Sequence, residues 1–75
     1  MDWRERISID PAIRFGKPCI RGTRIAVADV LGWMAAGMTI DEIVADYPPL
    51  SREDVLCCLS KAAEDQGAQR GSGVA

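Results

Sequence analysis

Two helix-start patterns, separated by a pair of prolines, constrain the fold of this chain most strongly. Residues 39–42 (TIDE) have the form of a capping box, in which the first and last side chains each bind a backbone amide. Residues 51–54 (SRED) repeat the pattern with Asp in place of the usual Glu. Between them, residues 47–49 (YPP) end the first helix, because a residue before proline is displaced from helical geometry. The sequence therefore predicts two helices joined by a short turn, starting after Thr39 and Ser51.

A further helix is predicted upstream of Gly37. Apolar residues recur at helical spacing from Val27 to Met38, and Asp29 falls in the first turn, where the helix dipole favours an anion. Gly37 occupies the position of a left-handed C-terminal cap. Three helices, the last two separated by about four residues, have the outline of a helix-turn-helix. Many small helical domains share this outline, so it does not by itself establish DNA binding.

The segment before Val27 lacks helical periodicity. Ile7 and Ile9 alternate with polar residues, which is typical of a short strand, and residues 24–27 form a second short stretch with β-branched side chains. Pro and Gly residues between them predict a long, turn-rich loop. We therefore expect one mainly α-helical domain (residues 1–66) with an extended or β-hairpin front (1–26), three helices (27–66) and a flexible tail (67–75).

The chain is acidic overall, with a formal net charge of −2, but residues 15–25 (FGKPCIRGTRI) contain no carboxylate. A basic front joined to an acidic body indicates either two kinds of partner or folding of one half onto the other. In the first case Lys17, Arg21 and Arg24, with Arg52 at the start of the last helix, contact nucleic-acid phosphates. In the second case the arginines bond to carbonyls and carboxylates of their own fold. We expect this structural role above all for Arg24, because an apolar residue follows it.

The last predicted helix is poorly suited to reading DNA bases. Residues 51–65 offer only Arg52 and Lys61 to base edges or phosphates, and they are outnumbered by Asp and Glu. DNA binding gains affinity mainly by neutralising phosphates, which an acidic helix opposes. Any DNA contact therefore depends on the basic front and on a dimer, which would present two copies of that front.

Enzyme, metal and cofactor chemistry find little support in the sequence. There is no His, and the three Cys residues have no metal-ligand spacing. Lys17 is followed by Pro18 instead of the Ser or Thr of a phosphate-binding P-loop. No nucleophile and base form a recognisable pair. We therefore predict a protein that is not an enzyme and has no catalytic, metal-binding or cofactor-binding residues.

The small size of the chain predicts self-association. A chain of 75 residues buries little apolar surface, and such chains usually gain stability from a second subunit. Trp33 lies off the apolar face of its helix and Trp3 lies near the N-terminus. Both are candidates for partner contact or, alternatively, for covering the front of the domain. The charged N-terminus and the lack of a long apolar run predict a cytoplasmic protein with reduced thiols and no membrane association.

Residues 7–63 resemble the family catalogued as domain of unknown function 433. The resemblance is carried by residues 16–27 (GKPCIRGTRIAV), 37–43 (GMTIDEI) and 47–55 (YPPLSREDV). Two positions depart from the family pattern, since Phe15 stands where glycine is common and Cys19 where valine is common. We expect both to be packing substitutions.

The resemblance implies a homeodomain-like helix-turn-helix with a short β element in front, commonly dimeric. Family members are often regarded as antitoxins of type II toxin–antitoxin pairs, encoded beside a PIN-like ribonuclease toxin. The first functional hypothesis is therefore a dimeric antitoxin that neutralises such a toxin and binds operator DNA for autoregulation. The alternatives are a stand-alone DNA-binding regulator and a protein-interaction domain without DNA contact. The net acidity of the chain favours a protein partner.

Overall fold

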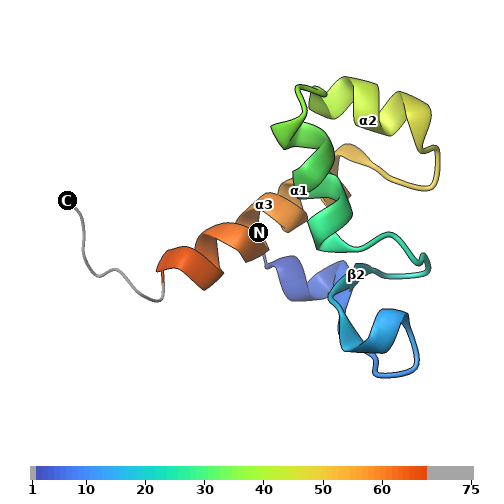
Figure 1. Cartoon of the computed structure of the whole chain (residues 1–75), viewed down its shortest axis with the longest axis vertical. Coiled ribbons are helices and arrows are strands. Elements are labelled where there is room, and N and C mark those ends of the chain that lie inside the picture. Colours follow the sequence, from blue (N-terminus) through green and yellow to red (C-terminus); the bar gives the residue numbers. More distant parts are fainter. Residues whose placement is uncertain (1, 68–75) are drawn as a thin grey trace.

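A computed structural model describes residues 2–67 of the chain (Figure 1). The helices are mainly in the second half, and two short 3-10 turns, marked η, lie in the first half. In chain order the elements are η1 (Trp3–Glu5), β1 (Ile7–Ser8), η2 (Arg14–Gly16), β2 (Cys19–Ile20), α1 (Val27–Ala35), α2 (Ile40–Asp46) and α3 (Arg52–Gly67). The mainly helical fold with an antiparallel hairpin in front confirms the predicted fold class. The predicted tail, residues 67–75, lies outside the described residues except for Gly67.

Helices α2 and α3 begin where the sequence predicts. The Thr39 hydroxyl accepts a hydrogen bond from the Glu42 amide (3.1 Å), and the Glu42 carboxylate accepts one from the Thr39 amide (2.8 Å). Ser51 and Asp54 form the same reciprocal pair before α3, at 3.2 and 2.9 Å. Both boxes satisfy amides that have no partner within the helix, so they fix the two ends of the connecting turn.

The end of α1 is set by Gly37. Its φ of 107° is one that residues with side chains rarely adopt. The Gly37 amide donates to the Met34 carbonyl, and the Met38 amide donates to the Trp33 carbonyl. This is the Schellman pattern, which ends a helix and directs the chain into the next one.

The second strand lies earlier than predicted. Strand β2 pairs with β1 in antiparallel register, Ile7 opposite Ile20. Residues 24–27 contribute only an isolated bridge, between Ala26 and Cys19, before the chain enters α1. The prediction of a strand at residues 24–27 is therefore wrong. A two-residue strand bracketed by Pro and Gly is too short to show the alternation from which strands are predicted.

Helix α3 is the centre of the fold. It contacts α1, α2, η1 and β1, and Figure 1 shows these elements arranged around it. Its own buried residues are Asp54, Val55, Cys57 and Cys58. Leu56, in contrast, is 37% exposed. Cys19 is buried in β2, which confirms that it is a packing residue. None of the helices formed by residues 2–67 has the length and hydrophobicity to cross a membrane.

Candidate functional site

Arg14 fastens the basic front segment to the start of α1. Its guanidinium donates to the backbone carbonyl of Arg24 (2.8 Å) and pairs with Asp29 (3.1 Å). Asp29 also accepts from the amide of Ala26 (3.0 Å), whose own side chain cannot cap the helix. This backbone hydrogen bond, supported by the Arg14 guanidinium, holds the pKa of Asp29 below its usual value.

The structural role predicted for Arg24 therefore belongs to Arg14. The Arg24 side chain is exposed and makes no hydrogen bond or ion pair within residues 2–67. Only its backbone carbonyl is used, as the acceptor for Arg14. The sequence could not separate the two arginines, because their roles depend on where the loop lies relative to α1.

The turn before the basic segment has an unusual backbone. Arg14, Phe15 and Gly16 all have positive φ, at 52°, 58° and 83°. For a residue with a side chain this conformation costs about 1–2 kcal/mol. Phe15 is 99% exposed, so no packing offsets that cost. The prediction that Phe15 is a packing substitution is wrong.

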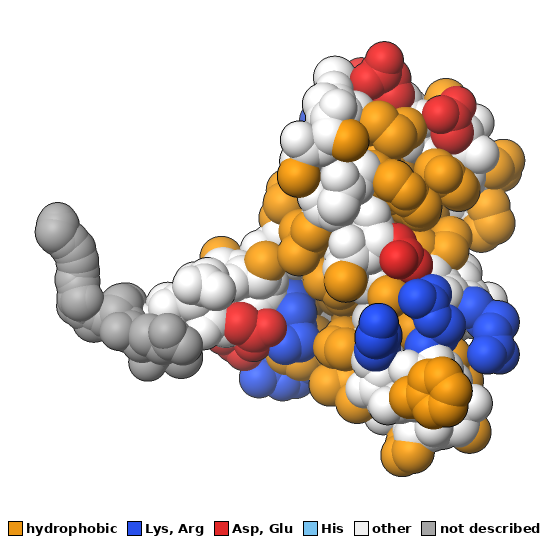
Figure 2. Space-filling model, viewed as in Figure 1, with side chains coloured by type: hydrophobic (Ala, Val, Ile, Leu, Met, Phe, Trp, Pro, Cys, Tyr) orange, Lys and Arg blue, Asp and Glu red, His pale blue; other side chains and the backbone are white. Residues whose placement is uncertain are grey.

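The front residues predicted to contact nucleic acid do not lie together: Arg21 lies near α3, and Lys17 lies near the start of α1. The Arg21 guanidinium donates to the Arg4 carbonyl (3.1 Å) and lines a shallow pocket with Asp54 of α3. Lys17 is exposed and acts electrostatically on Asp29, at the start of α1. Figure 2 shows Lys and Arg side chains gathered over the N-terminal front. Arg21 thus has a hydrogen-bond partner within the fold, whereas the side chains of Lys17 and Arg24 are exposed and have none among residues 2–67.

Arg52 lies apart from the cations of the front and forms an ion pair with a residue of α2. Its guanidinium pairs with Asp41 at 2.8 Å, and both side chains are well exposed. Apart from this pair, the exposed charged residues of α2 and of the first turn of α3 are all acidic: Glu42, Asp46 and Glu53. The outer surface of the helix-turn-helix is therefore negative, as the sequence indicated.

The two tryptophans have different environments. Trp33 is half-buried and stacks on Tyr47, with ring centroids 4.0 Å apart and an angle of 10° between the rings, which joins α1 to the end of α2. Trp3 is 9% exposed and belongs to the core. Its indole N–H is buried without a hydrogen-bond partner. Part of Trp33 is available to a partner, whereas little of Trp3 is.

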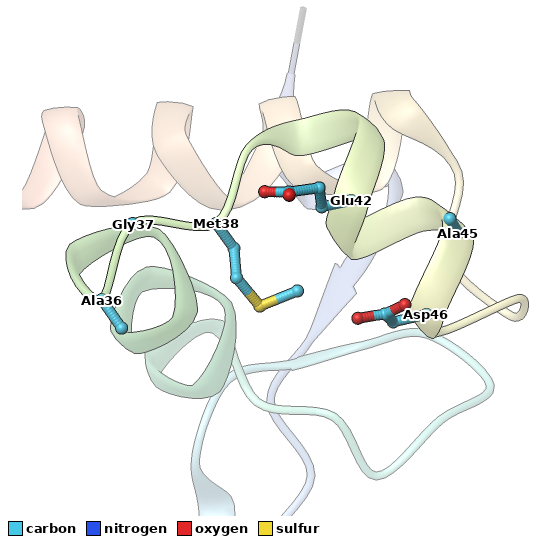
Figure 3. A pocket seen from close by; sticks show the side chains of 6 residues that line it. All are labelled: Ala36, Gly37, Met38, Glu42, Ala45 and Asp46. Carbon is cyan, nitrogen blue, oxygen red and sulfur yellow. The ribbon is translucent and has the colours of Figure 1, made fainter.

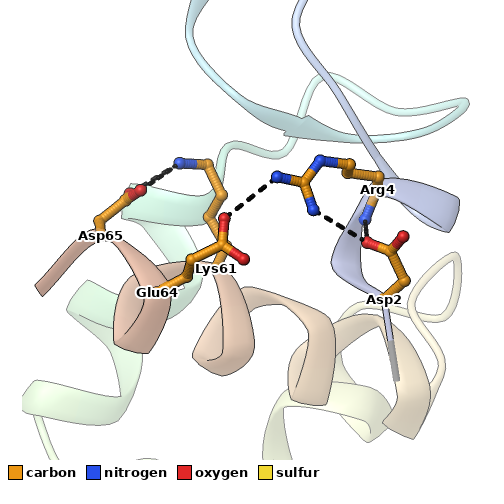
Figure 4. Close-up of polar contacts among 5 residues, drawn as sticks. All are labelled: Asp2, Arg4, Lys61, Glu64 and Asp65. Atoms are coloured by element: carbon orange, nitrogen blue, oxygen red, sulfur yellow. Dashed lines mark hydrogen bonds and ion pairs between the residues drawn. The ribbon is translucent and has the colours of Figure 1, made fainter. Parts of the chain in front are cut away.

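Figure 4 shows a cluster of charged side chains from the N-terminus and from α3. Arg4 bridges Asp2 (3.3 Å) and Glu64 (3.2 Å), and Lys61 pairs with Asp65 (2.6 Å). The Arg4 guanidinium and the Lys61 ammonium lie 4.5 and 4.9 Å from the centroid of the N-terminal indole ring, within cation–π distance. The ion pair between Arg4 and Glu64 attaches the front to α3. The two residues are far apart in the sequence, so no local pattern predicts their contact.

A pocket of about 490 Å³ lies between the end of α1 and α2 (Figure 3). It is lined by Ala36, Gly37, Met38, Glu42, Ala45 and Asp46, and we call it the Met38 pocket. The Met38 side chain projects into it, and the two carboxylates face it from α2. Neither α1 nor α2 has a basic residue in its last turn, so the partial negative charges of both helix ends are unopposed. The sequence analysis missed this pocket, because it depends on the angle between two helices.

The cysteines show no sign of reactivity. Burial raises the pKa of the Cys57 thiol, and it raises that of Cys58 to about 12, so both remain protonated near neutral pH. Within the described residues, no group of three His, Cys, Asp or Glu side chains is placed to hold a metal ion.

Residues 7–60 match the sequence profile of the family described as protein of unknown function (DUF433). This chain belongs to the DUF433 family. It is 36% identical over 52 residues to the uncharacterized protein y4eO of Sinorhizobium fredii (strain NBRC 101917 / NGR234), covering 69% of this chain and 24% of that protein.

Two crystal structures are similar to this DUF433 chain. A DUF433 member from Anabaena variabilis has a TM-score of 0.73 at 31% identity, covering 85% of this chain and 62% of that one. Rv2018 from Mycobacterium tuberculosis has a TM-score of 0.62 at 32% identity, covering 71% of this chain and 24% of that one. The chain thus spans about a quarter of y4eO and of Rv2018, and less than two thirds of the Anabaena protein.

Proposed function

We propose that this DUF433 chain is a small dimeric antitoxin-like module that binds and neutralises a PIN-like ribonuclease toxin. The observation that carries the proposal is the acidic outer surface of α2 and of the start of α3. A helix-turn-helix that reads DNA presents cations or amides on this surface. Here Arg52 is held by Asp41, and the charges around them are carboxylates. Such a surface repels phosphate and attracts a basic protein partner.

The first turns of α3 also carry apolar surface. Leu56 is 37% exposed and lies one turn beyond Arg52 and Glu53. In a protein interface an apolar centre is surrounded by a polar rim, and Leu56 among its charged neighbours fits that arrangement. The nature of the partner, a PIN-like ribonuclease, is suggested by the family resemblance.

The test is co-expression of the chain with PIN-like ribonucleases from the same genome. We expect one of them to arrest growth when expressed alone, and we expect the chain to restore growth and to form a stable complex with it by size-exclusion chromatography. Replacing Glu53 with Lys and Leu56 with Ser should abolish the complex. Glu64→Lys makes the same charge change near the other end of α3; it removes the exposed ion pair with Arg4 and should leave the complex intact. If none of these ribonucleases binds the chain, the proposal is wrong.

A second candidate function is DNA binding through the front. It is favoured by the exposure of Lys17 and Arg24, which have no hydrogen-bond or ion-pair partner within residues 2–67. Replacing both with Ala should weaken binding to all DNA sequences and reduce the salt dependence by about two counterions. The unfolding midpoint should not change. Titration of fluorescent DNA at several salt concentrations measures this, and undetectable binding by the wild-type chain contradicts it.

A further inference from the structure

Phe15 occupies a backbone position that glycine would adopt without strain. Its φ is 58°, and its side chain is 99% exposed. No hydrogen bond or packing contact within the described residues accounts for a phenyl ring at this place. Strained backbone positions cluster at functional sites, and aromatic side chains are frequent anchors of interfaces. The ring therefore points to a partner outside the monomer.

The charged residues beside Phe15 indicate which charge a partner surface carries. Lys17 and Arg24 border the turn and are exposed, while the local carboxylate, Asp29, is already engaged by Arg14 and by a backbone amide. A complementary surface thus combines an apolar recess for the ring with negative charges around it.

The Met38 pocket has both properties. Ala36, Met38 and Ala45 give it apolar surface, and two carboxylates and two unopposed helix C-termini give it negative charge. A cavity of about 150 Å³ holds a benzene molecule, so a pocket of about 490 Å³ admits a phenyl ring even though it is open to solvent. Methionine adapts its shape to aromatic rings and makes favourable contacts with them.

The positions of the two features suit a symmetric pair of chains. Residues 14–16 and α2 lie at opposite ends of the described chain (Figure 1). Figure 2 shows a group of Lys and Arg side chains in the lower part of this face and Asp and Glu side chains at its top, with hydrophobic side chains in between; a further acidic side chain adjoins the basic group. When two copies lie antiparallel, the turn at residues 14–16 of each copy meets α2 of the other. A single two-fold axis then generates two identical contacts.

We propose that a second copy of this chain docks in this way, with the Phe15 ring of each protomer in the Met38 pocket of the other. Lys17 and Arg24 then face Glu42 and Asp46 of the partner. The inference defines the interface of the dimer and rests on the proposed function only for the dimeric state. A single-stranded nucleic acid is a weaker fit, because one exposed ring gives only one stacking platform.

The first experiment is sedimentation equilibrium of the purified chain and its Phe15→Gly variant across the micromolar range. Glycine removes the ring, and it adopts a positive φ without strain. The dimer dissociation constant should rise by about a hundredfold, because each dimer loses two buried rings. The unfolding midpoint of the dilute monomer should stay the same or rise. Leu56→Ala removes exposed apolar surface from a different element and should leave the dimer unchanged.

The second experiment exchanges charges. Lys17→Glu and Asp46→Lys should each weaken self-association, because like charges then meet at both contacts. A mixture of the two variants should form a heterodimer, in which one contact keeps the native pair and the other has the reversed pair. In a mixture of Lys17→Glu and Glu53→Lys one of the two contacts stays repulsive, because Glu53 lies outside the Met38 pocket, so this heterodimer should be weaker than the first.

Three outcomes overturn the inference: a wild-type chain that is monomeric throughout, an unchanged dimer in Phe15→Gly, or charge-exchange variants that fail to pair. If Phe15→Gly stays dimeric but loses binding to a single-stranded oligonucleotide, the ring belongs to a nucleic-acid surface and the inference is likewise wrong. The purified chain is tested alone, so the absence of a ribonuclease partner, which would contradict the proposed function, does not affect this result.

Discussion

Replacing Asp54 with Ala should destabilise the fold by about 2–3 kcal/mol. Asp54 is 8% exposed; one carboxylate oxygen accepts from the Ser51 amide (2.9 Å), and the other accepts from the Arg6 guanidinium (3.2 Å). Losing its half of the capping box costs about 1 kcal/mol. Losing the charged hydrogen bond costs about 1–2 kcal/mol, because the Arg6 side chain is 43% exposed and is partly solvated without its partner.

The control is Asp41→Ala, which removes a shorter ion pair from the surface. Arg52 and Asp41 are 2.8 Å apart, but their side chains are 59% and 90% exposed. Screening by water should keep the loss below about 1 kcal/mol. Distance alone would rank the two ion pairs in the opposite order. The expected difference between the two variants therefore combines the burial of the Asp54 ion pair with the loss of its capping box.

The assay is thermal and urea unfolding of both variants, followed by circular dichroism at one low protein concentration. A low concentration is needed because dimerisation adds to the apparent stability. Asp54→Ala should lower the midpoint temperature by roughly 10–20 °C, and Asp41→Ala should lower it far less. If Asp41→Ala destabilises the chain as much as Asp54→Ala does, burial does not decide the strength of these ion pairs.

Three further predictions concern single groups. Thr39→Ala should lower stability by about 1 kcal/mol in urea unfolding, and an unchanged midpoint would show that the box does not stabilise α2. Because the pKa of Asp29 is lowered on folding from 3.8, its contribution is present above that pH and is lost as the pH falls through the folded value. Asp29→Ala should thus lose less stability between neutral and acidic pH than wild type does. Because folding raises the pKa of Cys58 from 9.0 to about 12, stability should fall above pH 9, and wild type should lose more of it there than Cys58→Ala does.

The helices could be predicted from the sequence because their ends are fixed by local contacts. Each capping box joins residues three positions apart, and the end of α1 is set by Gly37. The hairpin was predicted only in outline. Strand β2 is held by pairing with β1 and by the bridge to Ala26, which are contacts between distant residues. No local pattern carries that information.

The candidate site was predicted less well, for the same reason. The sequence identified the basic segment, but it did not show that Arg14 would bind Asp29 while Arg24 remained exposed. It also gave no sign that Phe15 would face solvent, since an aromatic side chain in a short chain is usually buried. Both outcomes depend on how the loop is placed against α1.

The division of charge along the sequence is explained mostly by the fold itself. Three ion pairs join the front to the helices: Arg4 with Glu64, Arg6 with Asp54, and Arg14 with Asp29. The front therefore folds onto the body, which was one of the two interpretations of the charge pattern. These pairs use the cations that can reach a carboxylate of their own chain. Among the described residues, Lys17 and Arg24 form no such pair, and Arg21 donates only to a backbone carbonyl. Within residues 2–67, Asp46 of the Met38 pocket forms no ion pair, and the Glu42 carboxylate accepts only from the Thr39 amide.

The charges left over are the ones that argue for an intermolecular contact. The front turn and α2 lie at opposite ends of the described chain, so the cations of one cannot approach the carboxylates of the other within a monomer (Figure 1). A fold that needed only solubility would not also hold a phenyl ring on a backbone with positive φ beside those cations. The unpaired charges and the exposed ring occur together at one end, and the pocket, with its apolar surface and negative charge, occurs at the other. A second copy of the chain matches all of these features at once, whereas a phosphate backbone matches only the cations.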